Sequence, residues 1–187
     1  MARPREFDTD AAMLGAMQVF WLKGYAATNL PDLLDAMNIT RGSFYKAFSD
    51  KESVYLAALD YYDDKVVSGV VDMLGSVRAT SASACLAPLF SGQGEFAERG
   101  CFICNAMVDL APFNPRVAAR THQMAERLRA AIEAVLDHFE IGGSAAHRRE
   151  LSELVLHLYL GFQAMGRADR KAQDWRARLA RLFEEPD

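Results

Sequence analysis

The sequence predicts an all-α protein in which a small N-terminal helical unit is joined by one long helix to a larger helical domain. Every strong hydrophobic periodicity in the chain repeats at three and four residues, and neither a β-hairpin signal nor an internal repeat is present. With 187 residues and 51% apolar composition, the chain can bury a sizeable core in one or two domains. We expect residues 1–50 to form the first domain and residues 51–187 the second.

Capping residues and apolar spacing predict the first two helices. Asp8 can cap a first helix, and Gly24 is expected to end it. Its apolar positions are Met13, Ala16, Met17, Phe20 and Trp21. A second helix is expected over residues 30–37, because Asn29 can begin it and Asp32 stands at the capping-box position.

A tight turn, a short helix and a long helix are expected next. Asn38 tolerates the left-handed conformation that a tight turn requires, and Thr40 can cap a third helix of about two turns. Ser49 and Glu52 form the S-x-x-E pattern of a capping box. This pattern predicts a long fourth helix that runs from there to about Leu74.

The rest of the chain also has helical periodicity. Serine, alanine and glycine surround a short apolar segment between residues 76 and 100, which predicts a short helix and a loop. Further helices are expected over residues 101–110, 115–140, 146–166 and 171–183. Asn114 can cap the second of these with Pro115 at its first position, and Ile141 with the two following glycines ends it.

Composition and charge exclude several classes of protein. The longest apolar run, LVLHLYLGF, is interrupted by His157 and is far shorter than the roughly 20 residues of a membrane span. The N-terminal MARPREFD lacks the apolar stretch of a secretory signal. An odd count of three cysteines does not suggest a disulfide framework. We therefore expect a cytoplasmic protein with reduced thiols and no membrane contact.

The net charge of the chain does not favour a protein that binds nucleic acid nonspecifically. The chain carries 21 Lys and Arg against 25 Asp and Glu, a net charge of -4, and the first 48 residues hold five cations and five anions. A neutral segment can still bind DNA if its cations share one face.

The stretch ITRGSFYKAFSDKESV places hydrogen-bond donors where a buried helix would carry leucine. A helix, a tight turn and a short polar helix form the helix-turn-helix plan, whose second helix lies in the major groove of DNA. Thr40 and Ser43 could then contact phosphate or base, and Arg41 could make a bidentate contact with guanine. Gly42 removes a side chain where the backbone approaches DNA.

The remaining residues of the third helix divide into two faces. Phe44 and Phe48 are expected to face inward onto the first two helices, whereas Tyr45 and Lys46 point outward to the flanking phosphates. The arm that carries Arg3 and Arg5 could enter the minor groove or could be a disordered terminus. A solvated surface helix, or a helix-turn-helix unit that binds another protein, is the alternative to DNA binding.

Residues 1–62 resemble the DNA-binding domain of TetR-family transcriptional regulators. The resemblance is carried by RPREFD, AMQVFWLKGYAATNLPDLLDAMNIT and RGSFYKAFSDKES. Asn38 stands where the family usually has glycine, and Leu34 stands where a small residue is usual. The resemblance implies that Thr28 and Lys51 also contact DNA. It further implies a homodimer on a palindromic double-stranded operator, and a second domain that binds a ligand and dimerises.

The second domain holds apolar and aromatic residues that could line an effector cavity or could equally be filled core. Those singled out as ligand-binding are Phe102, Met107, His122, Tyr159 and Phe162. Phe113, Met124, Leu128 and Met165 belong to the same set. We expect a small, mostly apolar effector whose binding releases a repressor from its operator, and no cofactor.

Cys101 and Cys104 form a CxxC pattern, which can be a redox pair or half of a zinc site. A second CxxC is missing, and the four histidines are scattered without ligand spacing, so no metal is expected. Two thiols three residues apart share a helix face, so a thiol sensor is the alternative mechanism of control. Buried small side chains are the simpler interpretation.

The last two predicted helices carry apolar faces and the small residues Gly161, Ala164 and Gly166. With the family resemblance, these features favour a four-helix bundle across a two-fold axis over helices that merely close the monomer core. We expect no enzyme activity, because no Cys/His or carboxylate pair has the spacing of a nucleophile and its base.

Overall fold

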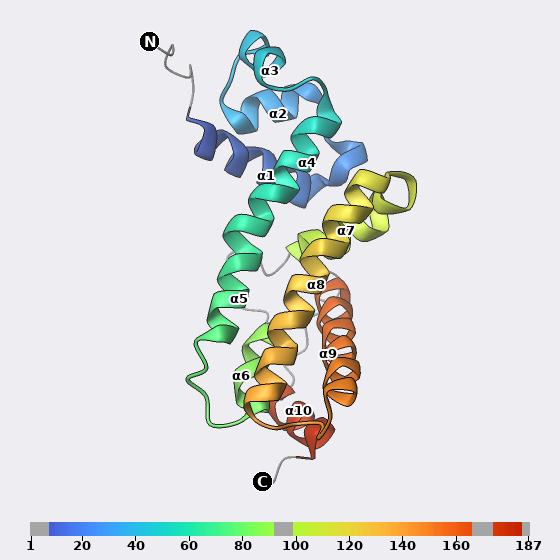
Figure 1. The fold of residues 1–187 in the computed structure, drawn as a ribbon. Helices are drawn as coiled ribbons and strands as arrows, with labels where there is room; N and C mark the ends of the chain where they lie inside the picture. Colours follow the sequence, from blue (N-terminus) through green and yellow to red (C-terminus); the bar gives the residue numbers. More distant parts are fainter. Residues whose placement is uncertain (1–7, 92–98, 166–173, 185–187) are drawn as a thin grey trace.

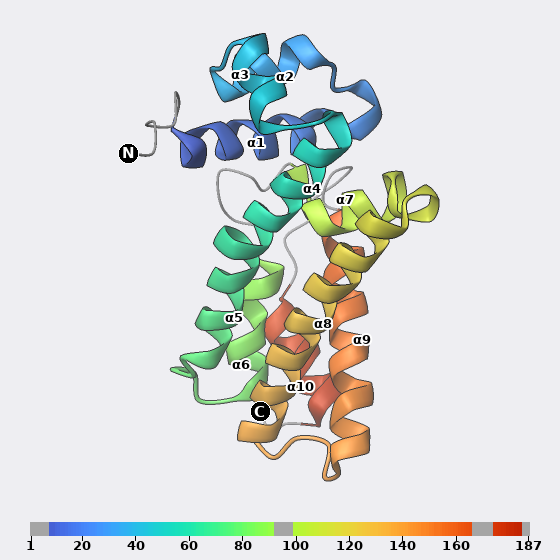
Figure 2. The ribbon, with the colours of Figure 1, turned by 45° about the horizontal axis from the view of Figure 1, so that its top comes forward.

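The computed structural model describes residues 8–91, 99–165 and 174–184, and it confirms the all-α class (Figure 1). Within these residues every regular element is a helix. Helices α1, α2 and α3 form one end of an elongated molecule, and the other helices extend away from them (Figures 1 and 2). None of the described helices combines the length and the apolar character that crossing a membrane requires.

Helix α1 spans Thr9–Ala27. The Asp8 side chain caps it, accepting hydrogen bonds from the backbone N–H groups of Asp10 and Ala11, as predicted. Gly24 has non-helical backbone angles, φ 79° and ψ 169°, so the regular first helix breaks at this residue as predicted. A short helical segment follows it up to Ala27.

Helix α2, Leu30–Met37, has the predicted bounds. The Asn29 side chain accepts from the N–H of Asp32 at 3.0 Å, and the Asp32 carboxylate accepts from the N–H of Asn29 at 2.9 Å. Asn38 is left-handed, with φ 52°, which confirms its predicted role in the turn. Helix α3, Arg41–Ala47, then begins after its N-cap Thr40.

Glycine at position 15 sets how closely α1 and α2 approach. A Cβ atom added at Gly15 would lie 1.9 Å from the carbonyl oxygen of Ala36 on α2. No side chain fits there, so the two helices cross at backbone distance. The core of this unit is then closed by the fully buried rings of Phe20 and Phe44 and by Leu33.

Helix α4, Lys51–Tyr62, begins one residue later than the predicted capping box implies. The reciprocal bonds join Asp50 and Ser53, not Ser49 and Glu52. Both patterns fit the sequence. The charged Asp50 carboxylate is the stronger acceptor for the helix N–H groups, which accounts for the observed choice.

The long helix predicted to reach about Leu74 is confirmed, with one irregularity. After α4 the chain forms a π-helical turn at Asp63–Val67 and continues as α5, Ser68–Gly75. Backbone angles remain helical at both junctions, so α4, the π turn and α5 form one continuous rod. We call this the α4–α5 rod. Single π turns inside helices often lie near functional sites.

The second domain surrounds helix α8, Pro115–His138, which Asn114 caps as predicted. Helix α6 (Ala82–Leu86) and the 3-10 turn Ala87–Phe90 occupy the segment where a short helix was expected. The other elements are α7 (Phe102–Asp109), a 3-10 turn (Ala111–Phe113), α9 (Ala145–Met165) and α10 (Trp175–Phe183). The predicted boundary residues Gly166 and Lys171 lie outside the described residues.

Arginines of α8 pair with acidic residues along the α4–α5 rod, and the two helices run side by side in both views (Figures 1 and 2). The pairs are Arg116 with Glu52, Arg120 with Asp60, and Arg127 with Asp63. Arg120 makes two bonds to one carboxylate, at 2.7 and 3.2 Å. Arg127 also donates to Ser68 at 3.0 Å, which places one guanidinium across the π turn. The orientation of the rod is thus tied to the second domain.

Candidate nucleic-acid interface

The turn between α2 and α3 is held by short-range hydrogen bonds. The backbone N–H of Ile39 donates to the carbonyl of Leu34 at 3.1 Å. The Thr40 hydroxyl oxygen accepts from the N–H of Ser43 at 3.1 Å and lies 3.1 Å from the Ser43 hydroxyl. These bonds fix the start of α3 relative to α2, at the tip of the molecule (Figure 1).

Helix α3 is anchored by the buried ring of Phe44 and exposes most of its polar residues. Phe44 is buried and packs against Phe48, with ring centroids 5.7 Å apart. Tyr45 is 58% exposed, and Arg41 and Lys46 are also exposed. The predicted inward and outward faces of α3 therefore match the observed burial. Arg41, Tyr45 and Lys46 form one exposed face, which we call the α3 face.

The fold itself does not require glycine at position 42. A Cβ atom there would lie 3.8 Å from the Thr40 hydroxyl oxygen, which is an ordinary contact. Gly42 is exposed, and it lies at the start of α3 beside the exposed Arg41. Packing within the described residues therefore gives no reason for glycine at this position.

Thr28 and Lys51, which the resemblance suggested as DNA contacts, have internal partners. The buried Thr28 hydroxyl donates to the carbonyl of Gly24 at 2.7 Å. The Lys51 ammonium donates to the carbonyls of Tyr25 and Thr28, each at 2.9 Å, and lies over the Tyr25 ring. These two residues close the C-terminal end of α1. The Thr28 hydroxyl and the Lys51 ammonium are thus engaged within the chain, and neither is proposed below as a DNA contact. Arg3 and Arg5 lie outside the described residues.

Phe102 on α7 lies at the junction of the two domains, within a cluster of aromatic rings. Its ring stacks on Trp21 of α1 and meets Tyr55 and Tyr62 of α4 edge-on, with centroids 5.7 and 5.6 Å away. Sequence reasoning grouped Phe102 with cavity-lining residues and did not assign Tyr55 or Tyr62. Their spacing of seven residues on one helix face was the available signal.

A buried polar group lies directly beside this aromatic cluster. The Tyr62 hydroxyl lies 3.8 Å from the Cys101 sulfur. Burial raises the pKa of Cys101, as it does the pKa values of Tyr62 and Tyr159. Cys104 is half-buried. Among the described residues no group of three or more potential metal ligands forms around this pair.

The remaining predicted ligand residues are spread over the second domain. Tyr159 and Phe162 of α9 pack against Phe90, with centroids 6.2 and 5.6 Å away. Met107 is half-buried on α7. The side chain of His122 lies on the exposed side of α8, so its expected place in a cavity wall does not fit the observed burial.

Comparisons with known proteins agree with this geometry. Residues 13–58 match the family described as bacterial regulatory proteins, tetR family. The HTH-type transcriptional repressor ComR of Escherichia coli (strain K12) is 35% identical over 134 residues. That alignment covers 67% of this chain and 63% of ComR, so the chain matches less than two thirds of the relative's length.

Two solved structures share the fold along nearly the whole chain. A cysteine mutant of the TetR-family regulator CifR, complexed with 26bp operator DNA, has a TM-score of 0.74 and 26% identity over 97% of this chain and 96% of that one. The reduced form of E. coli NemR has a TM-score of 0.78 over 95% and 96% of the chains, and its 16% identity shows the fold alone. From the helix-turn-helix geometry, the family match and these relatives, we conclude that the chain belongs to the TetR family of transcriptional regulators.

Proposed function

We propose that the protein binds a palindromic DNA operator as a homodimer and represses transcription until an effector releases it. The observation that carries this proposal is the exposed α3 face, held at the tip of the molecule by the buried Phe44. ComR is named a repressor, and the CifR structure contains operator DNA, which supports the same activity here.

Each residue of the α3 face has a distinct proposed role. Arg41 stands at the first position of α3 and reads a base edge through its planar pair of N–H donors. Tyr45 and Lys46 contact the flanking phosphates, together with the hydroxyls of Thr40 and Ser43. Gly42 allows the backbone to approach the duplex. Phosphate contacts set orientation and salt dependence, whereas Arg41 sets sequence preference.

An apolar stripe on α9 supports the proposed dimer. Leu154, Leu158 and Met165 are 43, 36 and 71% exposed. With Gly161 they recur at spacings of four, three and four residues, which places them on one helix face. A second copy of the chain that packs α9 against α9 would cover this face and let backbones approach at Gly161.

Two measurements test the dimer and the operator together. Sedimentation equilibrium should give a dimer, and a selection from random DNA should yield a palindrome with half-sites about one helical turn apart or somewhat more. The double variant Leu154→Glu/Leu158→Glu should be monomeric and bind this palindrome weakly. Val108→Glu is the matched control, because Val108 is exposed on α7 and lies off the α9 stripe. A dimeric double variant that keeps full operator affinity would exclude this interface.

The α4–α5 rod is the proposed lever for effector control. An effector releases DNA only if it binds the DNA-incompetent arrangement more tightly. We propose that it enters among Phe102, Tyr159 and Phe162, with Met107 at the edge, and that exposed His122 takes no part. Phe102 and Tyr159 are buried, so an entering molecule must displace side chains of the cluster. Such a displacement reaches α1 and α4 directly through Trp21 and Tyr55.

The alternative trigger is thiol modification. Cys104 is half-buried and therefore the more accessible thiol, whereas burial raises the pKa of Cys101 and keeps it protonated. Replacing both cysteines by serine separates the two triggers. A ligand-controlled protein keeps its response to its inducer in this variant, and a thiol sensor loses every response while still binding the operator.

A further inference from the structure

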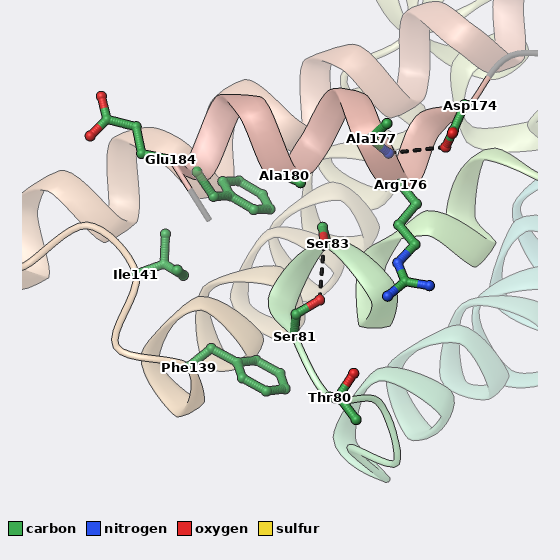
Figure 3. Close-up of a pocket in the computed structure, with 11 residues that line it drawn as sticks. Thr80, Ser81, Ser83, Phe139, Ile141, Asp174, Arg176, Ala177, Ala180 and Glu184 are labelled. Carbon is green, nitrogen blue, oxygen red and sulfur yellow. Dashed lines mark hydrogen bonds between the residues drawn. The ribbon is translucent and has the colours of Figure 1, made fainter. Parts of the chain in front are cut away.

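A groove of about 700 Å³ lies in the part of the second domain that is far from α3. It opens between the start of α6, the connection after α8, and helix α10 (Figure 3). This volume is in the range of sites for small molecules. None of the residues proposed above for the effector site lines the groove.

One end of the groove is polar. The hydroxyl-bearing residues Thr80, Ser81 and Ser83 line it, and Figure 3 shows the guanidinium of Arg176 extending from α10 toward them. Ser81 and Ser83 bond to each other at 3.0 Å. Arg176 is exposed and has no ion pair with another described residue. The Ser81 oxygen also accepts from the N–H of Ala84 as the N-cap of α6, and Ser83 is buried. The exposed Arg176 and Thr80 are therefore the polar residues that this end offers to an occupant.

The other wall of the groove is apolar, and part of it is formed by small residues of α10. Ala177 and Ala180 form this part, and Phe183 continues it one turn later. Phe139 and Ile141 stand opposite, on the connection after α8 (Figure 3). Larger side chains at the two alanines would fill the space between these walls.

The acidic residues at the edge limit the charge of any occupant. The Asp174 carboxylate is engaged as the N-cap of α10, accepting from the N–H of Ala177 at 3.0 Å. Glu184 lies at the opposite end of α10, and its carboxylate points away from Arg176 in Figure 3. Because the lining carries one cation and two carboxylates, an anion is favoured only where it contacts Arg176 directly, and a second negative charge on the occupant would be repelled.

We propose that this groove binds a small amphipathic monocarboxylate. Its carboxylate accepts two parallel bonds from Arg176 and a further bond from the hydroxyl of Thr80. Its alkyl or aryl body lies along Ala177 and Ala180, opposite Phe139 and Ile141. The site is separate from the effector site of the proposed function, and its occupancy is measured without DNA.

Calorimetric titration of the full-length protein with octanoate, and with octanol as the uncharged counterpart, tests this site. The wild-type protein should bind octanoate more tightly than octanol. Arg176→Gln should weaken octanoate binding about tenfold or more and leave octanol binding unchanged, because only the carboxylate loses a charged partner. Arg181→Gln, an exposed arginine on the same helix that does not line the groove, is the matched control and should change neither.

A groove-filling variant completes the test. Ala180→Phe should abolish binding of both molecules, with helical circular dichroism and thermal unfolding recorded to show that the variant is folded. Equal octanoate affinities in the Arg176 and Arg181 variants would overturn the proposed anion contact. Octanoate binding that survives Ala180→Phe in the folded protein, or that is absent from the wild type, would overturn the site itself.

Discussion

The indole ring of Trp21 stacks on the ring of Phe102 with centroids 6.3 Å apart and planes inclined by 29°. Trp21 belongs to α1 of the N-terminal unit, and Phe102 is the first residue of α7 in the second domain. The two domains therefore share one aromatic core, so a displacement of α7 changes the packing of the unit that carries α3.

Removing the Phe102 ring should lower the stability of the protein substantially. Phe102→Ala removes a fully buried ring, so the free energy of unfolding should fall by about 3–5 kcal/mol in urea titrations followed by circular dichroism. Phe113→Ala is the control, because this ring is 82% exposed, and the change should stay within about 0.5 kcal/mol. A decrease in the free energy of unfolding for Phe102→Ala as small as that for Phe113→Ala would show that the Phe102 ring does not stabilise the junction of the domains.

Two glycines should respond in opposite ways to alanine. Gly15→Ala places a Cβ atom against the Ala36 carbonyl, so it should unfold the N-terminal unit or displace α2 and abolish operator binding. Gly42→Ala meets no close atom and favours the helix, so thermal unfolding should occur at the same or a slightly higher temperature. Its operator affinity should nevertheless fall. Unchanged affinity would mean that the backbone at Gly42 does not approach DNA.

Arg41 and Lys46 should affect operator binding differently. Arg41→Ala should relax base preference at one position of each half-site, at a cost of about 1–3 kcal/mol there. Lys46→Ala should weaken all sequences alike and lower the salt dependence of binding by about one phosphate contact. Fluorescence anisotropy with an operator and a scrambled duplex at several salt concentrations distinguishes them. A uniform loss in both variants would contradict the assignment of Arg41 as a base reader.

Alkylation should distinguish the thiols. Iodoacetamide reacts with the thiolate, so half-buried Cys104 should be modified first in the native protein. Cys101 is buried and burial raises its pKa, so it should react only after denaturant is added. Peptide mass spectrometry over time measures both rates. Faster native modification of Cys101 than of Cys104 would contradict this order of accessibility.

Stability should decline at alkaline pH because buried phenols stay protonated in the folded state. Burial raises the pKa of Tyr62 well above the ordinary value of 10.0, and burial also raises the pKa of Tyr159. The unfolded chain releases these protons near pH 10, so the stabilisation is complete below that pH and is lost as pH rises toward the folded-state pKa values. Each phenol contributes a slope of about 1.4 kcal/mol per pH unit.

Replacing these phenols should flatten the alkaline decline stepwise. Tyr62→Phe should have a shallower slope than the wild type, and Tyr62→Phe/Tyr159→Phe a shallower one again, in urea titrations between pH 8 and about 12. The comparison uses slopes, because loss of the hydroxyl that contacts Cys101 also changes the stability at neutral pH. Parallel slopes in all three proteins would show that other groups cause the decline.

The sequence by itself determined the local structure of the N-terminal unit. Asn29, Asp32 and Thr40 occur where the observed caps form, and Asn38 takes the left-handed turn as predicted. These features depend on hydrogen bonds between residues two to four positions apart, so they can be predicted from a short window. The polar face of α3 followed from helical spacing for the same reason. Only the choice between two overlapping capping boxes before α4 was wrong.

The tertiary structure alone decided which distant residues meet. Lys51 bonds to carbonyls of Tyr25 and Thr28, 26 and 23 residues earlier in the chain, which turned two expected DNA contacts into a helix closure. Phe102 stacks on Trp21, a contact between two domains that helical spacing did not predict. The close approach at Gly15 and the groove beside Arg176 also depend on how helices cross. Helix periodicity predicts which face of a helix is buried, but the neighbour that buries it is set by the packing of the whole chain.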